Sequence, residues 1–216
     1  MIEIDVTLHF TTPPAVGSGA QVGTLAQRSF IKDREGWAYI PATALKGKVR
    51  HAVEQVARGT GRTVCETHHK MCREHPCPAC RIFGSPWIPG AVRFANLTLS
   101  GPAELLQQRK EKTARPLYPY RYGVALNRRR KVAEDNLLYT TELFQPGVPV
   151  AFSGTLDGAI DLESAAWLAA GLQLMANLGQ GKSTGLGWCR AEVTVRQDDA
   201  EITPAQLRAA LQEVAQ

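Results

Sequence analysis

The chain has 216 residues, of which 44% are hydrophobic, so it can bury one substantial core. It contains no apolar run of about 18 residues and does not begin like a signal peptide, so we expect a soluble, cytoplasmic protein that does not span a membrane. The net charge is +5, from 25 basic and 20 acidic residues, which is too small an excess to indicate a partner unless the charge is concentrated in one place.

Hydrophobic periodicity predicts six core elements, in the order strand, helix, strand, strand, helix, strand. Thr43 and Asp161 are the expected caps of the two helices, and a last helix is expected from Thr203. The expected strands are residues 2–10, 91–99, 148–156 and 188–195, and the expected core helices are residues 43–59 and 161–178. This order predicts an α+β fold, namely a ferredoxin-like, RRM-like βαββαβ palm, in a single domain over residues 1–216.

Two segments interrupt this pattern, and the first, residues 59–89, carries four of the five cysteines. Cys77 and Cys80 form a C-x-x-C knuckle, and Cys65 and Cys72 supply two further thiols. Four cysteines complete a tetrahedral zinc site, which is structural because it leaves no position for water. The first pair has wider spacing than a usual knuckle, so a histidine is an alternative ligand, and unligated buried thiols are a further alternative. The candidate histidines are His68, His69 and His75.

The second segment, residues 101–146, carries most of the positive charge. Nine basic residues and one acidic residue lie within residues 109–131, and the rest of the chain holds 16 basic and 19 acidic residues. A local patch of this kind favours nucleic acid as a partner. Apolar flanks around a charged, turn-forming middle predict a projecting hairpin, whose four consecutive cations at residues 128–131 would neutralise phosphates. The hairpin tyrosines, which either stack on bases or pack against the core, are Tyr118, Tyr120 and Tyr122.

Residues 177–188, N-L-G-Q-G-K-S-T-G-L-G-W, join the second core helix to the last core strand. The four glycines free backbone N–H groups to form an anion-binding concavity, to which Lys182 adds a charge and Ser183 and Thr184 add hydroxyl donors. The stretch is not a nucleotide-binding P-loop, because Ala176 stands where that motif needs its first glycine. We expect contact with a sugar-phosphate backbone, and the alternative is a flexible connection without a ligand.

Four motifs follow one another along the chain: Y-I-P-A-T-A-L-K-G-K-V-R at residues 39–50, C-P-A-C-R-I-F-G-S at 77–85, A-L-N-R-R-R-K-V-A-E-D-N-L-L-Y-T-T-E at 125–142 and L-G-Q-G-K-S-T-G-L-G at 178–187. In this order they resemble the signatures of the repeat-associated mysterious proteins, or RAMPs, of CRISPR systems: I-P-G-S-S-L-K-G-x-x-R, C-x-x-C-R-L-F-G-S, a thumb segment and a glycine-rich loop. The resemblance covers about residues 1–195 and is closest to the small backbone subunits of type III and related class 1 effector complexes.

The resemblance implies a subunit that stacks with copies of itself and with other effector subunits along the crRNA, and presents this guide for pairing with target RNA or another complementary nucleic acid. The glycine-rich loop and the basic residues near position 46 would hold the guide, and the hairpin would be the thumb that wedges between bases. The residues expected to bind RNA are Lys46, Lys48, Arg50, Arg121, Arg128, Arg129, Arg130, Lys131, Gly179, Gly181, Lys182, Ser183 and Thr184.

One departure from the family pattern bears on catalysis. Catalytic backbone subunits carry an aspartate in the loop after the first strand, and the matching position here is Gln27, whose neutral amide replaces neither a hard-metal ligand nor a general base. Asp33 matches a downstream acid of the pattern. We therefore expect binding of guide and target without cutting. The alternatives are a target-cutting endoribonuclease that uses Asp33, a guide-processing endoribonuclease that uses His9 or His51, and a zinc-stabilised domain that binds other proteins.

Overall fold

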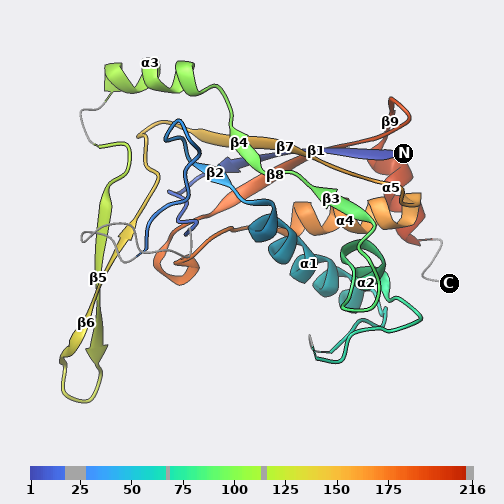
Figure 1. Cartoon of the computed structure of the whole chain (residues 1–216), viewed down its shortest axis with the longest axis horizontal. Coiled ribbons are helices and arrows are strands. Elements are labelled where there is room, and N and C mark those ends of the chain that lie inside the picture. The colour runs from blue at the N-terminus through green and yellow to red at the C-terminus, as the bar shows by residue number, and fades with distance from the viewer. Residues whose placement is uncertain (18–27, 67–68, 113–115, 213–216) are drawn as a thin grey trace.

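The computed structural model describes residues 1–17, 28–66, 69–112 and 116–212, which form a main antiparallel sheet, helices packed on it and a separate hairpin (Figure 1). The strands are β1 (Ile2–Phe10), β2 (Tyr39–Ile40), β3 (Val92–Phe94), β4 (Leu97–Leu99), β5 (Tyr120–Asn127), β6 (Val132–Glu142), β7 (Val150–Gly158), β8 (Cys189–Gln197) and β9 (Ala200–Ile202). The helices are α1 (Ala42–Gly59), α2 (Pro78–Phe83), α3 (Pro102–Lys112), α4 (Leu162–Leu174) and α5 (Pro204–Gln212), with a 3-10 turn, η1 (Lys182–Thr184). The α+β class expected from the sequence is confirmed.

The main sheet is organised around β1, which pairs along its whole length with β7 on one side and β8 on the other. The strand order is β2-β4-β7-β1-β8-β9, and β3 also pairs with β7. The alternating sequence of β1 buries Ile4, Val6 and Leu8 on one face. Its other face carries polar residues, including Thr7 and His9, because successive side chains point to opposite sides of a strand.

Helices α1 and α4 lie together against one face of the sheet (Figure 1). The apolar stripe of α1 includes Leu45, Val49 and Val53, none of which is exposed at all. The two helix backbones approach closely at Gly171 of α4, where an added Cβ would lie 2.5 Å from a methyl group of Val53. This contact joins both helices into the core with the buried side chains of β1.

Helix α1 begins at Ala42, and the prediction that Thr43 caps it is wrong. Pro41 occupies the N-cap position and makes no side-chain capping bond. The first free amide of the helix, on Ala42, donates instead to Asn96 Oδ1 at 2.8 Å. The strand predicted at residues 91–99 is broken into β3 and β4 at this asparagine. A helix cap supplied from about fifty residues away leaves no local sequence signal.

Helix α4 is capped as predicted, since Asp161 Oδ1 accepts a hydrogen bond from the Ser164 amide at 2.7 Å. The helix ends at Leu174 and not at residue 178, because Met175 is extended and Leu178 donates to Gly187 O at 2.9 Å. The final helix, α5, begins at the predicted place, directly after Thr203.

Between β4 and β7 the chain forms α3 and then the β5–β6 hairpin, which stands apart from the main sheet (Figure 1). The sequence pattern does not predict α3. Leu105 is its one buried apolar residue in the part whose side chains the structure describes, so the helix lacks the apolar stripe that identifies most surface helices. Because α3 contains part of the basic run, the positive charge is divided between a helix and a hairpin.

Candidate RNA interface and metal centre

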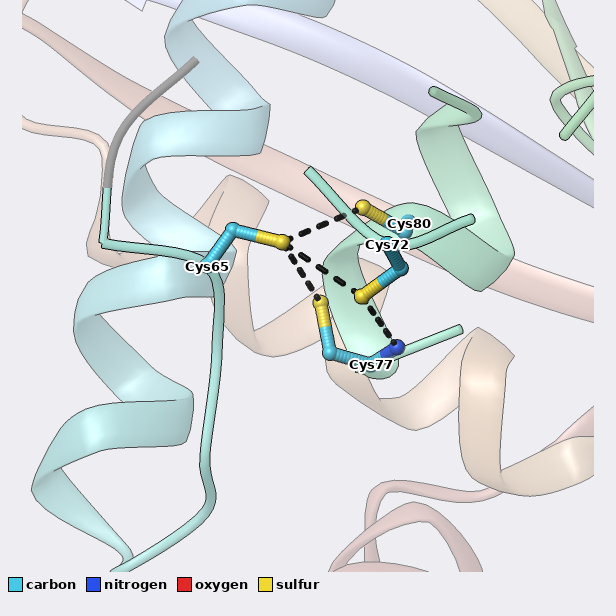
Figure 2. Close-up of side chains that lie close together, drawn as sticks. All are labelled: Cys65, Cys72, Cys77 and Cys80. Atoms are coloured by element: carbon cyan, nitrogen blue, oxygen red, sulfur yellow. Dashed lines mark hydrogen bonds between the residues drawn. The ribbon is translucent and has the colours of Figure 1, made fainter. Parts of the chain in front are cut away.

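The four clustered cysteines belong to the part of the chain that connects α1 to β3. Cys65 and Cys72 come from the loops that follow α1, Cys77 is the N-cap of α2, and Cys80 lies inside that helix. Pro78 at the first position of α2 suits this start, because the amide that proline lacks has no partner there in any helix. Figure 2 shows the four sulfur atoms turned toward one another.

The spacing of the sulfur atoms fits a tetrahedral metal site. Cys65 Sγ lies 3.4 Å from Cys72 Sγ, 3.9 Å from Cys77 Sγ and 3.6 Å from Cys80 Sγ, and all four lie within 4.8 Å of one another. Zinc–sulfur bonds of about 2.3 Å would place the sulfur atoms about 3.8 Å apart. A disulfide would bring one pair to about 2.05 Å. The cluster is therefore four separate thiols, compatible with zinc.

The candidate histidine ligands fall outside this cluster or outside the described chain. Among the described residues, the four cysteines are the only group of three or more potential ligands arranged to hold a metal ion. His69 and His75 line the two cavities beside Cys65 but are not members of the group. His68 lies outside the described residues.

Burial raises the pKa of two of the clustered thiols, Cys65 and Cys80. Burial, together with hydrogen bonds to Cys72 and Cys80, raises the pKa of the Cys65 thiol to about 12. Burial also raises the pKa of Cys80. The pKa of Cys77 is lowered, because burial, which acts against the thiolate, is outweighed by hydrogen bonds from its neighbours. A metal ion must displace protons from such thiols, so its binding is favoured at high pH.

The glycine-rich loop, residues 177–188, has a backbone conformation that requires glycine. Gly179, Gly181, Gly185 and Gly187 all have positive φ, from 70° to 93°. At Gly179 an added Cβ would also lie 2.6 Å from the carbonyl oxygen of Ala15. The conformation strains any other residue, and the close approach excludes a side chain.

Hydrogen bonds hold this loop against the segment that follows β1. The Gln180 amide donates to Ala15 O at 2.9 Å, and the Gly187 amide donates to Pro13 O at 3.0 Å. The Thr184 hydroxyl, expected to face a ligand, donates to Gly181 O at 2.9 Å within the loop. The Ser183 side chain is exposed.

Two arginines from distant segments bind the same loop. Arg28 Nη1 donates to Gln180 Oε1 at 3.2 Å, and Arg121 Nη1, from β5, donates to Thr184 O at 3.1 Å. The Arg28 guanidinium also lies 5.3 Å from the centre of the Tyr139 ring on β6, within range of a cation–π interaction. These contacts join the base of the hairpin to the glycine-rich loop.

A cavity of about 320 Å³ lies between the loop and the hairpin base. We call it the loop–hairpin cavity. Its lining includes two guanidinium groups, two tyrosine rings and two hydroxyl groups, a combination that suits a phosphate and a base. The residues concerned are Arg28, Arg121, Tyr122, Tyr139, Ser183 and Thr184.

Lys48 of α1 faces the start of the same loop. Its Nζ donates to Asn177 Oδ1 at 2.7 Å. Burial and then the neighbouring charge of Lys182 lower the pKa of Lys48. The two ammonium groups repel each other, and an anion bound beside them would relieve that repulsion.

The four cations predicted to bind phosphate occupy the exposed tip of the hairpin. Asn127 Oδ1 pins the turn by accepting from the amides of Arg129 at 3.1 Å and Arg130 at 2.9 Å. The tip therefore presents Arg128 to Lys131 on an ordered turn, far along the hairpin from the main sheet (Figure 1).

The predicted RNA-binding residues are thus not all in one place. Lys46 lies beside Gly90 and 6.0 Å from the centre of the Phe94 ring, and Arg50 contacts the cysteine cluster. Gly47, between Lys46 and Lys48 on α1, is not packed against another backbone, since an added Cβ there would meet no neighbouring atom within 4 Å.

The candidate catalytic residues are dispersed. Asp33 Oδ1 accepts from the amides of Glu35 and Trp37 and so closes a turn. His9 Nε2 lies 3.1 Å from Glu192 Oε2 on the polar face of the sheet, and His51 lines a cavity beside Cys65. Gln27 lies outside the described residues.

Of the three hairpin tyrosines, Tyr118 packs against the core and the other two are exposed. Tyr118 precedes β5 and packs against Phe144, with ring centres 5.4 Å apart, while its hydroxyl donates to Gly36 O. Burial raises the pKa of Tyr118 to about 12. Tyr120 and Tyr122 are exposed on the hairpin. The fifth cysteine, Cys189, is a buried residue of β8.

The RAMP superfamily model matches residues 7–190, a span that includes all four motifs and the cavity. The chain belongs to the RAMP superfamily. No curated protein matches it. Membership implies a CRISPR-associated role in binding or processing RNA. In the part of this RAMP that the structure describes, no helix combines the length and the apolar character needed to cross a membrane.

The sequence pattern assigns no role to Arg28, Tyr139 or Asn177 individually. Tyr139 lies inside the thumb motif, Asn177 begins the glycine-rich loop and Arg28 lies outside both, but the contacts of all three join segments more than a hundred residues apart. The loop motif itself was the available signal, since the partners of a glycine-rich backbone must come from elsewhere in the fold.

Proposed function

We propose that this RAMP is a guide-RNA-binding backbone subunit of a class 1, type III-like CRISPR effector complex, and that it binds RNA without cutting it. Copies of the chain stack along the crRNA with other effector subunits and present the guide for pairing with target RNA. The observation that carries the proposal is the loop–hairpin cavity, where the glycine-rich loop and the hairpin base meet.

The chemistry of this cavity supports a sugar-phosphate ligand. Each of Arg28 and Arg121 spends one N–H on the loop, and a guanidinium has five donors, so both retain donors for a phosphate. Tyr122, which is 71% exposed, offers a ring face on which a base can stack irrespective of its sequence, and the Tyr139 ring beneath Arg28 forms part of the same cavity wall. A subunit that holds many different guides needs such sequence-independent contacts.

The proposal treats the main sheet as a ferredoxin-like palm in a single domain, with a zinc-binding insertion at 59–89 and a thumb insertion at 101–146. The order β4-β7-β1-β8, with α1 after β1 and α4 after β7, supports this interpretation, because a βαββαβ chain gives that arrangement. The zinc is structural, since four sulfur ligands leave no position for water.

RNA binding is tested by measuring the affinity for a single-stranded guide RNA over a range of salt concentrations. Log affinity of the wild type should fall linearly with log salt, and Arg28→Ala with Arg121→Ala should reduce that slope by about 1.4, or 0.7 per lost phosphate contact. Arg93→Ala is the control, because this exposed arginine pairs with Asp157 on β7. A salt-independent affinity would instead indicate the protein-interaction domain.

The absence of cleavage is tested on the complex assembled with guide and complementary target, in magnesium or manganese. Regularly spaced cuts that arise only in Gln27→Asp would support a subunit that lacks the catalytic acid. Cuts by the wild type that vanish in Asp33→Ala would contradict the proposal and identify this chain as the nuclease. The two turn amides that occupy Asp33 Oδ1 favour the first outcome.

A further inference from the structure

Arg50, the last residue of K-G-K-V-R in the first motif, contacts the cysteine cluster. Arg50 Nη2 lies 3.5 Å from Cys80 Sγ, within the range of an N–H···S hydrogen bond. On the same guanidinium, Nη1 donates to Gly84 O at 2.9 Å, and Nε donates to Glu54 Oε1 at 3.1 Å. All three edges of the guanidinium are therefore used, and less than a fifth of the Arg50 side chain is exposed.

Lys48, two residues earlier, faces a different site. Residues two apart on a helix differ by about 200° around its axis, so they point to nearly opposite sides. Lys48 reaches Asn177 in the glycine-rich loop, whereas Arg50 reaches the loop and helix that carry the cysteines. One short motif thus serves two separate sites.

The contact between Arg50 and Cys80 would offset the negative charge of an occupied metal site. Four thiolates around a dication leave a net charge of −2 in a partly buried place, and such a charge needs hydrogen-bond donors or cations close by. Arg50 supplies both at Cys80, the one ligand of the four that is fully buried. Glu54 fixes the position of the guanidinium by accepting a hydrogen bond from its Nε.

The Gly84 contact adds a geometric constraint. Gly84 has φ of +85°, and an added Cβ would lie 2.6 Å from the Gly90 amide nitrogen, so this turn is tightly packed. Through Gly84 and Cys80, Arg50 holds both ends of a turn of α2 against α1.

We propose that Arg50 is a positioning residue of the metal centre, which orients Cys80 and stabilises its thiolate, and that it is not a ligand of RNA. This inference rests on the proposed occupancy of the cluster by zinc. It assigns the arginine of the first motif and the C-P-A-C-R-I-F-G-S motif to a single structural unit.

The experiment measures zinc affinity by competition with a chelator, and the absorption of the cobalt-substituted protein. Arg50→Ala should weaken zinc binding about ten- to a hundredfold. It should also move the sulfur-to-cobalt charge-transfer band to longer wavelength, because loss of the N–H donor raises the energy of the sulfur electrons. Arg50→Lys should show smaller changes in the same directions, because it keeps the charge but not the three-edged geometry.

Arg81→Ala is the matched control. Arg81 follows Cys80 directly but pairs with Asp161 and Glu163 at the start of α4, so its loss should leave the cobalt band in place. The proposal is supported if the slope of log RNA affinity against log salt concentration is the same for Arg50→Ala as for the wild type. A slope reduced by about 0.7, or a cobalt band and zinc affinity unchanged in both Arg50 variants, would overturn it. If the wild-type protein binds no zinc, the proposed role of Arg50 is overturned. The proposed RNA-binding function is judged separately, from the salt dependence of RNA affinity.

Discussion

The metal-binding segment, residues 59–89, and the β5–β6 hairpin both connect elements of the same sheet and helices. They differ in how far their apolar side chains are buried. In α2 of the metal-binding segment, Cys80, Ile82 and Phe83 are at most 4% exposed. On the hairpin, Tyr122 is 71%, Leu126 64% and Leu138 61% exposed. Helix α2 is therefore part of the core, whereas the hairpin offers an apolar surface of the kind that marks an interaction site.

The two segments also differ in how firmly they are attached to the rest of the fold. Arginines of α1 and α2 tie the metal-binding segment to both helices under the sheet. In the part of the chain that the structure describes, the hairpin is held at its base, where Lys32 pairs with the buried Glu142 at 2.8 Å and Arg28 joins Tyr139 to the loop. A change in the metal-binding segment should therefore alter stability, and a change along the hairpin should alter RNA binding.

The largest expected effect is loss of the metal. Cys80→Ser removes a buried ligand, so we expect loss of bound zinc and a fall in Tm of about 10 °C or more, because a chain of this size loses about 2–4 °C per kcal/mol. Calorimetry with metal analysis measures both. Cys189→Ser is the control, since this buried cysteine is outside the cluster and its loss should leave the zinc in place. An unchanged Tm would contradict the claim that the metal-binding segment contributes to the stability of the fold.

The second effect is a pH dependence confined to the metal-binding segment. Because the pKa of Cys65 is raised to about 12, its proton is bound throughout the neutral range and must be released when zinc binds. Apparent zinc affinity should therefore fall by about tenfold or more for each pH unit lost between pH 8 and pH 6. Chelator competition at several pH values measures this, and a flat profile would mean that the thiols are already ionised.

The third effect separates the hairpin from the core. Replacing all four tip residues, Arg128 to Lys131, by alanine should reduce the salt slope of RNA binding by about 3, from 0.7 per phosphate. The Tm should change by less than about 2 °C, because these side chains are exposed. Arg190→Ala, on an exposed strand position, controls for net charge. A large fall in Tm with an unchanged slope would reverse the roles given to the two segments.

The smallest expected effect sharpens the role of the glycine-rich loop. Gly179→Ala adds a clash with Ala15 to the strain of positive φ and should cost about 2–3 kcal/mol, whereas Gly185→Ala adds strain alone and should cost about 1 kcal/mol. Denaturant unfolding measures both. Equal costs would show that the loop is not packed against the segment after β1.

The sequence predicted what depends on local pattern. The alternation in β1, the cap at Asp161 and the spacing of the four cysteines are all local, and the structure has each of them. Asn96 at the start of α1 and Arg28 at the loop–hairpin cavity act across the fold and gave no pattern. Arg50 was assigned to RNA with Lys46 through the resemblance of their motif to a family signature, whereas the structure places Arg50 at the cysteine cluster and Lys48 at the glycine-rich loop.

Photo-crosslinking of a bound guide RNA, followed by mass spectrometry of the crosslinked peptides, tests the central claim most directly. The account predicts crosslinks on β5, on β6 and on the glycine-rich loop, with Tyr122 and Tyr139 foremost because their rings line the cavity. Crosslinks concentrated between Cys65 and Cys80, or on the polar face of the main sheet, would contradict it.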